Sequence, residues 1–250
     1  VVGRSIDAVV ELGAVGMAMR RVPAGITAPT LYAHATSSGG GSDASADIVA
    51  ALRSAATATG GIAVTPAAVP GGLLPPSSLF SIIRRHPSTP GVVLAEYDGE
   101  YIDPFHGSAY DSGVDAVDAP RMARAAAALA RALATMSLGG GSGDKAGGAA
   151  VAVAVAGAVD DAAVAATVAE LVQCLIDPSI GFECALGRRL FTASAKFPTR
   201  YTGVVPGLLD DIQHPLGKSD MQRFVWNFLG NATAAGNSSR RACAGFDVGG

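Results

Sequence analysis

The stretch "EYIDPFHGSAYDS" (residues 100–112) holds the side chains of this sequence that are best suited to chemistry. His106 lies there between Asp103 and the pair Tyr110-Asp111, shortly after an apolar run at 91–97 that predicts a buried strand. Enzymes with α/β folds place metal ligands and catalytic bases in loops at the carboxyl ends of strands. His106 is therefore a candidate metal ligand or general base.

A metal site needs more ligands than His106 alone. A catalytic zinc takes three protein ligands, and a two-metal site adds a bridging carboxylate. The other histidines, His34, His86 and His214, are far from it in the sequence and form no pair at ligand spacing. Carboxylates that could contribute are those of Asp7, Glu11, Glu96, Asp98, Glu100, Asp103 and Asp111. Acids near strand ends are more commonly solvated than catalytic, so both roles stay open for them.

Motifs of nucleotide binding, hydrolysis and redox chemistry are missing. The sequence has no Walker A, G-x-S-x-G, H-E-x-x-H or C-x-x-C pattern. The runs "SGGGS" and "LGGGSGDK" lack phosphate-loop spacing, and we expect neither to join a strand to a helix. Ser77 and Ser78 have no histidine or acid pattern nearby, so nothing supports a catalytic nucleophile there.

The composition indicates a globular chain that does not bind nucleic acid. The chain has 250 residues, of which 49% are apolar and 16% charged, and its formal net charge is −3. That apolar fraction is ample for a buried core, whereas nucleic-acid binding usually needs a basic face. The most apolar stretch, 149–159, reaches about half the length of a membrane span, so we expect no crossing. The chain does not begin with Met and opens on strand-like residues, so we interpret it as a fragment.

Hydrophobic periodicity predicts strands that alternate with helices. Strands are expected within 5–19, at 62–69 and at 91–97, and helices at 43–61, 77–86, 118–143, 160–177 and 219–230. Ser45 or Asp43 is expected to cap the first helix, Ser77 or Ser78 the second and Asp118 the third. This alternation places the first two-thirds of the chain in the α/β class, followed by a loop-rich last third.

The predicted helix at 118–143 carries an apolar stripe. Met122, Ala126, Leu129, Leu133 and Met136 recur at helical spacing, and we expect this stripe to pack against the core. The Ala/Gly-rich stretch that follows is of low complexity and is interpreted as a surface insertion or linker.

Cysteines and glycosylation sequons favour an oxidising compartment. The sequons are Asn231-Ala232-Thr233 and Asn237-Ser238-Ser239, which follow a helix expected to end at Gly230 and are interpreted as part of a polar loop. Two sequons near a cysteine favour the secretory pathway, and the alternative is a cytosolic chain with buried free thiols.

Seven segments of the chain resemble the nicastrin family, whose members are large glycosylated subunits of the γ-secretase complex. Four of them, "SIDAVVELGAVG", "LLPPSSLFSIIRR", "PGVVLAEYDGEY" and "FHGSAYDSG", occur in this order and with similar spacing in that family. The segments "ELVQCLIDPSIGFECALGRRLF", "YTGVV" and "RFVWNFLGNATA" look most like plant and algal members. The resemblance covers most of the chain and fails over the Ala/Gly-rich parts, 20–60 and 139–160.

The resemblance implies an α/β fold in which a mixed β-sheet lies between helices, similar to the large lobe of the zinc aminopeptidase and transferrin-receptor superfamily. A loop-rich, disulfide-containing C-terminal appendage follows that lobe. The expected division is the C-terminal half of the large lobe at 1–138, an Ala/Gly-rich insertion or linker at 139–159, and a membrane-proximal part at 160–250. The family's small lobe, substrate-engaging segment and membrane span are expected outside this chain.

The function that the resemblance implies is non-catalytic. Family members support γ-secretase assembly, act as gatekeepers for substrates, and so assist intramembrane proteolysis of type I membrane proteins. The implied partners are presenilin, which carries the catalytic aspartates, and the other γ-secretase subunits. The implied location is the lumenal or extracellular part of a single-pass protein of the endomembrane system and plasma membrane, and no cofactor is implied.

The resemblance also bears on whether His106 could bind zinc. In active relatives of the superfamily a zinc histidine lies three residues before a Tyr-acid pair, and that position before Tyr110-Asp111 is Gly107 here. Glycine has no side chain to bind a metal, so we expect neither catalytic residues nor stoichiometric zinc. A one-residue bulge would bring His106 into register, so an active zinc aminopeptidase with ligands upstream of residue 1 is the alternative. A secreted structural glycoprotein is a third interpretation.

Modifications follow from the implied location. In an oxidising lumen, Cys174 and Cys184, which have nine residues between them, are expected to form a disulfide. Asn231 and Asn237 are expected to carry glycans. The pairing of Cys243 stays open.

Overall fold

The computed structural model describes residues 6–18, 30–36, 44–68, 74–106, 108, 110–111, 113–139, 145–177, 179–180, 183–190 and 224–233. The chain divides into two compact units, Val1–Ala169 and Glu170–Gly250, and each is described by itself. His214, Asn237, Cys243 and Gly107 lie outside the described residues.

The first unit contains a four-stranded mixed sheet with the strand order β1-β4-β2-β3. The strands are β1 (Val9–Leu12), β2 (Thr30–Ala35), β3 (Ala63–Pro66) and β4 (Gly91–Ala95). β1 pairs with β4 and β2 with β3 in parallel, whereas β2 and β4 are antiparallel. The mixed sheet between helices that the sequence predicted is confirmed.

A parallel strand–helix–strand unit is formed by β2, helix α1 (Ala44–Thr59) and β3. α1 ends where predicted, because Gly60 and Gly61 adopt φ angles of 75° and 63°, which glycine reaches at low cost. Ser45 does not cap α1 but is buried within it, with its Oγ 2.9 Å from Thr36 Oγ1. The run "SGGGS" does connect a strand to a helix, contrary to expectation, although its residues are outside the described part.

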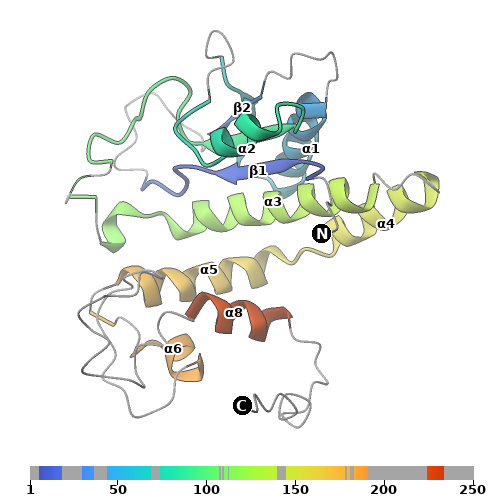
Figure 1. Cartoon of the computed structure of the whole chain (residues 1–250). Helices are drawn as coiled ribbons and strands as arrows, with labels where there is room; N and C mark the ends of the chain where they lie inside the picture. Colours follow the sequence, from blue (N-terminus) through green and yellow to red (C-terminus); the bar gives the residue numbers. More distant parts are fainter. Residues whose placement is uncertain are drawn as a thin grey trace, which may run out of the picture. The chain divides into compact units, whose positions relative to one another are not determined.

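The main core lies between one face of the sheet and helices α1 and α3 (Ala119–Gly139), as Figure 1 shows for the long helix below β1. Asp118 caps α3 as predicted, because its Oδ1 accepts a hydrogen bond from Arg121 N at 2.9 Å. The predicted stripe was wrong in detail, since Leu133 is 45% exposed. Small residues pack against the sheet instead, namely Ala125, Ala128 and Ala132, with Leu129 and Met136 partly buried beside them. Alanine allows the helix to approach the sheet closely.

The opposite face of the sheet is covered by the short helix α2 (Leu79–Arg85), which Figure 1 shows on the other side of β1 from α3. Its first residue, Leu79, is fully buried against β4. A Cβ on Gly91 would lie only 2.8 Å from Leu79 Cδ1, so the close approach of α2 to the strand requires glycine at that position.

The Ala/Gly-rich segment forms helix α4 (Lys145–Gly157), which the sequence did not predict. α4 runs back along α3 (Figure 1), with Ala152 buried in between. Arg131 of α3 holds the junction with helix α5 (Asp161–Ile176): its Nη1 donates to Asp161 Oδ1 at 2.7 Å and to Thr59 Oγ1 at 2.9 Å, and its Nη2 donates to Val159 O at 3.0 Å. This arginine therefore ties α1, α3 and the α4–α5 junction together.

No single helix in the described part of the chain is both long and apolar enough to span a membrane. One pair meets the length and composition criteria only when taken together, residues Ala150–Gly157 with Asp161–Ile176, and it is bent by 55° at the break.

The second unit is built around a disulfide between Cys174 and Cys184. The end of α5, helix α6 (Ala185–Leu190) and helix α8 (Phe224–Thr233) contribute to its core. Phe224 and Leu186 are buried beside the disulfide, and an exposed ion pair between Arg189 and Glu170 at 2.9 Å adds a contact at the margin. α8 continues to Thr233, so the predicted helix end at Gly230 was wrong.

Candidate functional site

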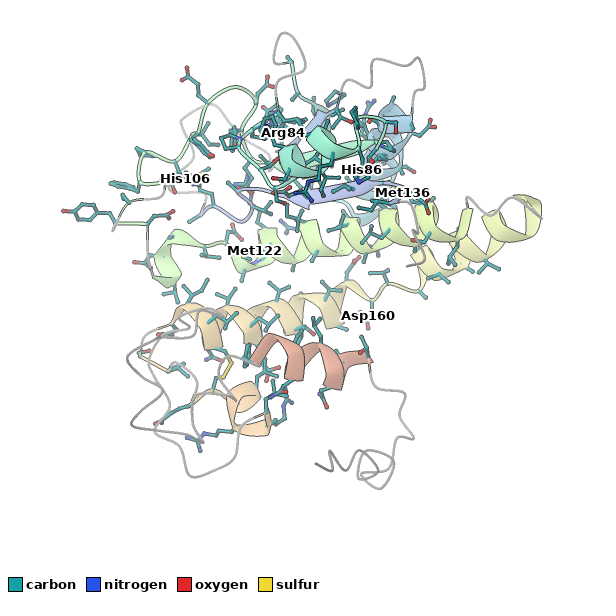
Figure 2. All side chains as sticks on the ribbon, in the orientation of Figure 1. Arg84, His86, His106, Met122, Met136 and Asp160 are labelled. Atoms are coloured by element: carbon teal, nitrogen blue, oxygen red, sulfur yellow. A yellow bond between two sulfur atoms is a disulfide. The ribbon has the colours of Figure 1, made fainter. Side chains whose placement is uncertain are left out.

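The loop that follows β4 places His106 against a tyrosine rather than a second ligand. The backbone N–H of His106 donates to Asp103 O at 3.2 Å, and its exposed imidazole stacks on Tyr101, with ring centroids 3.9 Å apart and planes inclined by 15°. Figure 2 shows His106 on this loop, well apart from His86 beside α2. His106 therefore lies on a loop that follows a buried strand, as predicted, but its side chain contacts the ring of Tyr101.

An aromatic row continues from His106 into the interior. Tyr101 lies 4.4 Å from Tyr97, and Tyr97 lies 5.9 Å from His34, measured between ring centroids. His34 of β2 is 4% exposed; its Nε2 is 3.0 Å from Tyr97 O, and its Nδ1 has no hydrogen-bond partner among the described residues. Burial, and then hydrogen bonding with Tyr101, raises the pKa of Tyr97 above its usual range.

The histidines do not assemble a metal site in the part of the chain that the structure describes. No group of three or more His, Cys, Asp or Glu side chains there could hold a metal ion. His34 and His106 are separated by the rings of Tyr97 and Tyr101. The contact between His34 and Tyr97 was not predicted, because nothing local in the sequence links a residue of β2 to one that follows β4.

Glu96, a candidate carboxylate in the sequence, is a buried structural anchor. It accepts hydrogen bonds from Gly16 N at 3.0 Å and Met17 N at 2.9 Å, and it pairs with Arg121 Nε at 2.8 Å. Both side chains are almost fully buried, and Arg121 Nη1 also donates to Met17 O at 3.3 Å. Burial raises the pKa of Glu96, while the two N–H groups and Arg121 act in the opposite direction. The contacts of Glu96 and Arg121 join the end of β4 to the segment after β1 and to the start of α3.

Glu11, a second candidate, stabilises the start of α2. Its carboxylate accepts hydrogen bonds from Ser78 N at 3.0 Å, Ser78 Oγ at 2.9 Å and Leu79 N at 2.8 Å. Burial alone would raise the pKa of Glu11, but these hydrogen bonds bring it below its ordinary value. Ser78 makes no side-chain cap bond of its own, so the predicted serine cap was wrong: the cap comes from β1.

The remaining candidate acids are dispersed. Asp98 Oδ1 accepts Ala68 N at 2.7 Å and holds the end of β3, and Asp103 Oδ1 accepts Phe105 N at 2.9 Å. Asp7, Glu100 and Asp111 are exposed. The arrangement therefore uses its two best-placed acids, Glu11 and Glu96, to hold the fold.

Replacing Glu11 by glutamine is expected to lower the free energy of unfolding by about 1 kcal/mol, the usual value of a helix N-cap. Because the folded-state pKa of Glu11 is lowered, its contribution is present above the unfolded-state pKa and is lost as the pH falls through the folded-state pKa. Urea unfolding at neutral and acidic pH measures this difference. Exposed Glu100→Gln is the matched control, and an equal effect of both variants would contradict the capping role.

The first sequon lies in a helix and not in the expected loop. Asn231 is exposed in the last turn of α8, where Thr233 Oγ1 donates to Leu229 O at 2.7 Å. The side chain of Asn231 is thus accessible, while the threonine hydroxyl is engaged with the backbone.

Together these features define an α/β lobe, a mixed sheet between helices, followed by a disulfide-bonded helical segment. The family model described as the nicastrin large lobe matches residues 1–139, more than half of the chain, and the chain belongs to the nicastrin family. The similarity to this family that the sequence indicated is thereby confirmed.

One curated protein and one solved structure extend this comparison. Nicastrin from Arabidopsis thaliana is 29% identical over 232 residues, which is 92% of this chain and 32% of that protein. A crystal structure of "the gamma-secretase component Nicastrin" is similar at 23% identity with a TM-score of 0.42, covering 52% of this chain and 21% of that one. The chain thus spans about a third of the length of the curated relative that it matches.

Proposed function

We propose that this chain is part of the ectodomain of a nicastrin that acts as a non-catalytic subunit of γ-secretase. In that role it supports assembly of the complex and selects type I membrane proteins for intramembrane proteolysis. The observation that carries the proposal is the match of residues 1–139 to the nicastrin large lobe. The similarity to Arabidopsis nicastrin, which extends over 92% of this chain, supports the same role for the residues beyond that lobe.

The structure supports a scaffold role in two ways. Two of the candidate acids serve the fold: Glu11, in β1, accepts hydrogen bonds from the start of α2, and Glu96, directly after β4, is held by backbone N–H groups and Arg121. The disulfide between Cys174 and Cys184 suits the lumenal or extracellular location proposed for the chain. The division at 1–138, 139–159 and 160–250 stays a prediction.

The assembly proposal is tested in the organism's own cells. The intact protein that carries this chain, affinity-tagged and extracted in a mild detergent, is expected to co-purify with presenilin and the other γ-secretase subunits. Depletion of the intact protein from these cells should stop cleavage of the membrane-bound remnant of a type I membrane protein. A tagged unrelated membrane glycoprotein is the control. The proposal would be overturned if the tagged protein were purified without an intramembrane aspartyl protease. It would also be overturned if cleavage were unchanged after the tagged protein had been depleted from the cells.

The absence of catalysis is a separate prediction. The purified protein is expected to bind no stoichiometric zinc and to release no product from an amino-acid nitroanilide, because His106 stacks on Tyr101 instead of joining other ligands. Metal analysis and a chromogenic assay measure both. If the protein did bind zinc, and if His106→Ala removed that zinc while the control His86→Ala kept it, the result would favour the aminopeptidase alternative.

Glycosylation at Asn231 and Asn237 is also proposed. Asn231→Gln and Asn237→Gln are each expected to remove the mass of one N-glycan from the secretory-pathway protein, as mass spectrometry before and after amidase treatment would measure. Since Thr233 is bonded within α8, we expect the glycan on Asn231 to be added before this helix closes. Unchanged masses in both variants would contradict the prediction.

A further inference from the structure

Helix α2 presents to solvent one side that carries an aromatic ring and two arginines. Phe80 is 48% exposed, and Ser81, Arg84 and Arg85 are exposed on the same helix, where Figure 2 labels Arg84. Successive residues of a helix are about 100° apart, so these four positions lie on the side of α2 opposite the buried Leu79. Phe80 and Arg84 are neighbours one turn apart. We call Phe80, Ser81, Arg84 and Arg85 the outer face of α2.

The helix that carries the outer face is held in place at both ends. At its start, Glu11 accepts three hydrogen bonds from Ser78 and Leu79. The side chain of Leu79 is fully buried. At its end, His86 N donates to Ile82 O at 2.8 Å. A partner would therefore meet a backbone that is already ordered, which lowers the entropic cost of binding.

The charge of this region is positive, in a chain whose net charge is −3. Residues 48–95 contain three arginines and no aspartate or glutamate. Within the part of the chain that the structure describes, the guanidinium groups of Arg84 and Arg85 make neither an ion pair nor a hydrogen bond. Glu11 contacts the other end of α2, where backbone N–H groups engage its carboxylate. The two arginines are thus left to pair with a group outside the described residues.

The side chains of the outer face match an acidic protein segment. Arginine pairs with carboxylates through a two-pronged fork, and aromatic residues and arginine are enriched in protein interfaces. Surfaces that bind anionic lipid usually gather about four to eight basic residues, more than the two of this face. The negative charge of the whole chain disfavours nucleic acid. These observations favour a protein over a membrane or a nucleic acid.

We propose that the outer face of α2 docks an acidic segment of a protein partner. Carboxylates of that segment pair with Arg84 and Arg85, and one of its apolar side chains packs on Phe80. The proposal goes beyond the function proposed above and does not depend on it. Binding to the purified chain alone tests it, so its failure would leave membership of γ-secretase untouched.

The binding test uses the 250-residue chain and fluorescein-labelled octapeptides of glutamate and glycine with one central leucine. Peptides in which glutamine or lysine replaces glutamate are the controls. Fluorescence anisotropy is expected to show that the glutamate peptide binds about tenfold more tightly than the glutamine peptide, as two exposed ion pairs near the upper end of their usual strength would give. The difference should shrink at high salt. The net charge of the chain by itself favours the lysine peptide, so equal or tighter binding of that peptide would overturn the proposal.

Matched variants locate the binding site. Arg84→Gln and Arg85→Gln are each expected to weaken binding of the glutamate peptide about two- to fivefold and to reduce its salt dependence. Phe80→Ser should weaken binding of the glutamate and glutamine peptides alike. Two controls should leave the affinity unchanged: Arg53→Gln, at an exposed arginine of α1, and Leu133→Ser, at a similarly exposed (45%) residue of α3.

Two results would reject the proposal. One is an equal loss of affinity in Arg53→Gln and Arg84→Gln. The other is binding of the chain to phosphatidylserine vesicles, abolished by Arg84→Gln with Arg85→Gln, without binding of the glutamate peptide, because the occupant would then be a membrane. Arginines in the last turn also stabilise a helix through its dipole, so circular dichroism melting verifies that each variant is folded. If the arginine variants were unfolded, the comparison of Phe80→Ser with Leu133→Ser would decide the location.

Discussion

Arg121→Met is expected to lower the free energy of unfolding by about 3–5 kcal/mol, because it leaves the carboxylate of Glu96 buried without its counterion. The pair is 2.8 Å apart, and both side chains are at most 3% exposed. Gly16 N and Met17 N would still bond to the carboxylate, but two neutral donors do not replace a guanidinium. Urea unfolding at neutral pH measures the loss.

The pH dependence of this variant has a defined sign. Burial raises the pKa of Glu96 in the folded protein, and removal of Arg121 raises it further. A carboxyl with a raised folded-state pKa destabilises the fold as the pH rises from the unfolded-state to the folded-state pKa. The difference between the two proteins should therefore shrink in acid, where Glu96 is protonated.

Two further variants separate the ion pair from other effects. Arg124→Met removes an exposed arginine from the same helix and is expected to change stability by no more than about 0.5 kcal/mol. The double variant Glu96→Gln with Arg121→Met should recover part of the loss, since it leaves no buried charge. A loss in Arg121→Met as small as in Arg124→Met would show that the pair does not anchor the fold.

Removal of the disulfide is the second large effect. Cys174→Ala with Cys184→Ala is expected to cost the second unit roughly 2–3 kcal/mol, as the loss of a short covalent loop predicts. The residues are 10 apart in the sequence and almost fully buried beside Phe224. Limited proteolysis of residues 170–250 should become faster, and denaturant unfolding should shift accordingly.

The control for the disulfide lies beside it. Glu183→Gln breaks only an exposed, 3.8 Å contact with Arg188, which contributes little. Reductant should sensitise the native protein to proteolysis as the double variant does. Equal proteolysis of the native, Glu183→Gln and cysteine-free proteins would contradict a stabilising role for the disulfide.

Local signals predicted the elements whose ends are marked by particular residues. Gly60-Gly61 ended α1, Asp118 began α3, and the apolar run before Glu96 formed the fully buried β4. Such signals act within a few residues, so they can be recognised without knowing the fold. α4 was missed because its Ala/Gly composition shows neither caps nor periodicity, and it is stabilised by packing on α3.

Contacts between distant residues could not be predicted in the same way. Glu11 lies 67 residues from Ser78, and His34 lies 63 from Tyr97, so each pair is known only once the strand order is known. The predicted stripe on α3 failed for a related reason, since size decided which residues face the sheet and alanines were preferred over Leu133. The loop that carries His106 follows a buried strand, as predicted, but the contacts of the nearby acids depend on these long-range pairs.

The strand order also bears on how the chain folds while it is being made. Of the four strands that the structure describes, β4 comes last in the sequence yet lies between β1 and β2, so these two strands cannot be joined until residue 95 has been made. Until then β2, α1 and β3 can form as a local unit, whereas β1 lacks β4, the strand with which it pairs in this sheet. While residues 36–90 are being made, the edges of β1 and β2 that pair with β4 are therefore open, a period in which binding by chaperones would matter most.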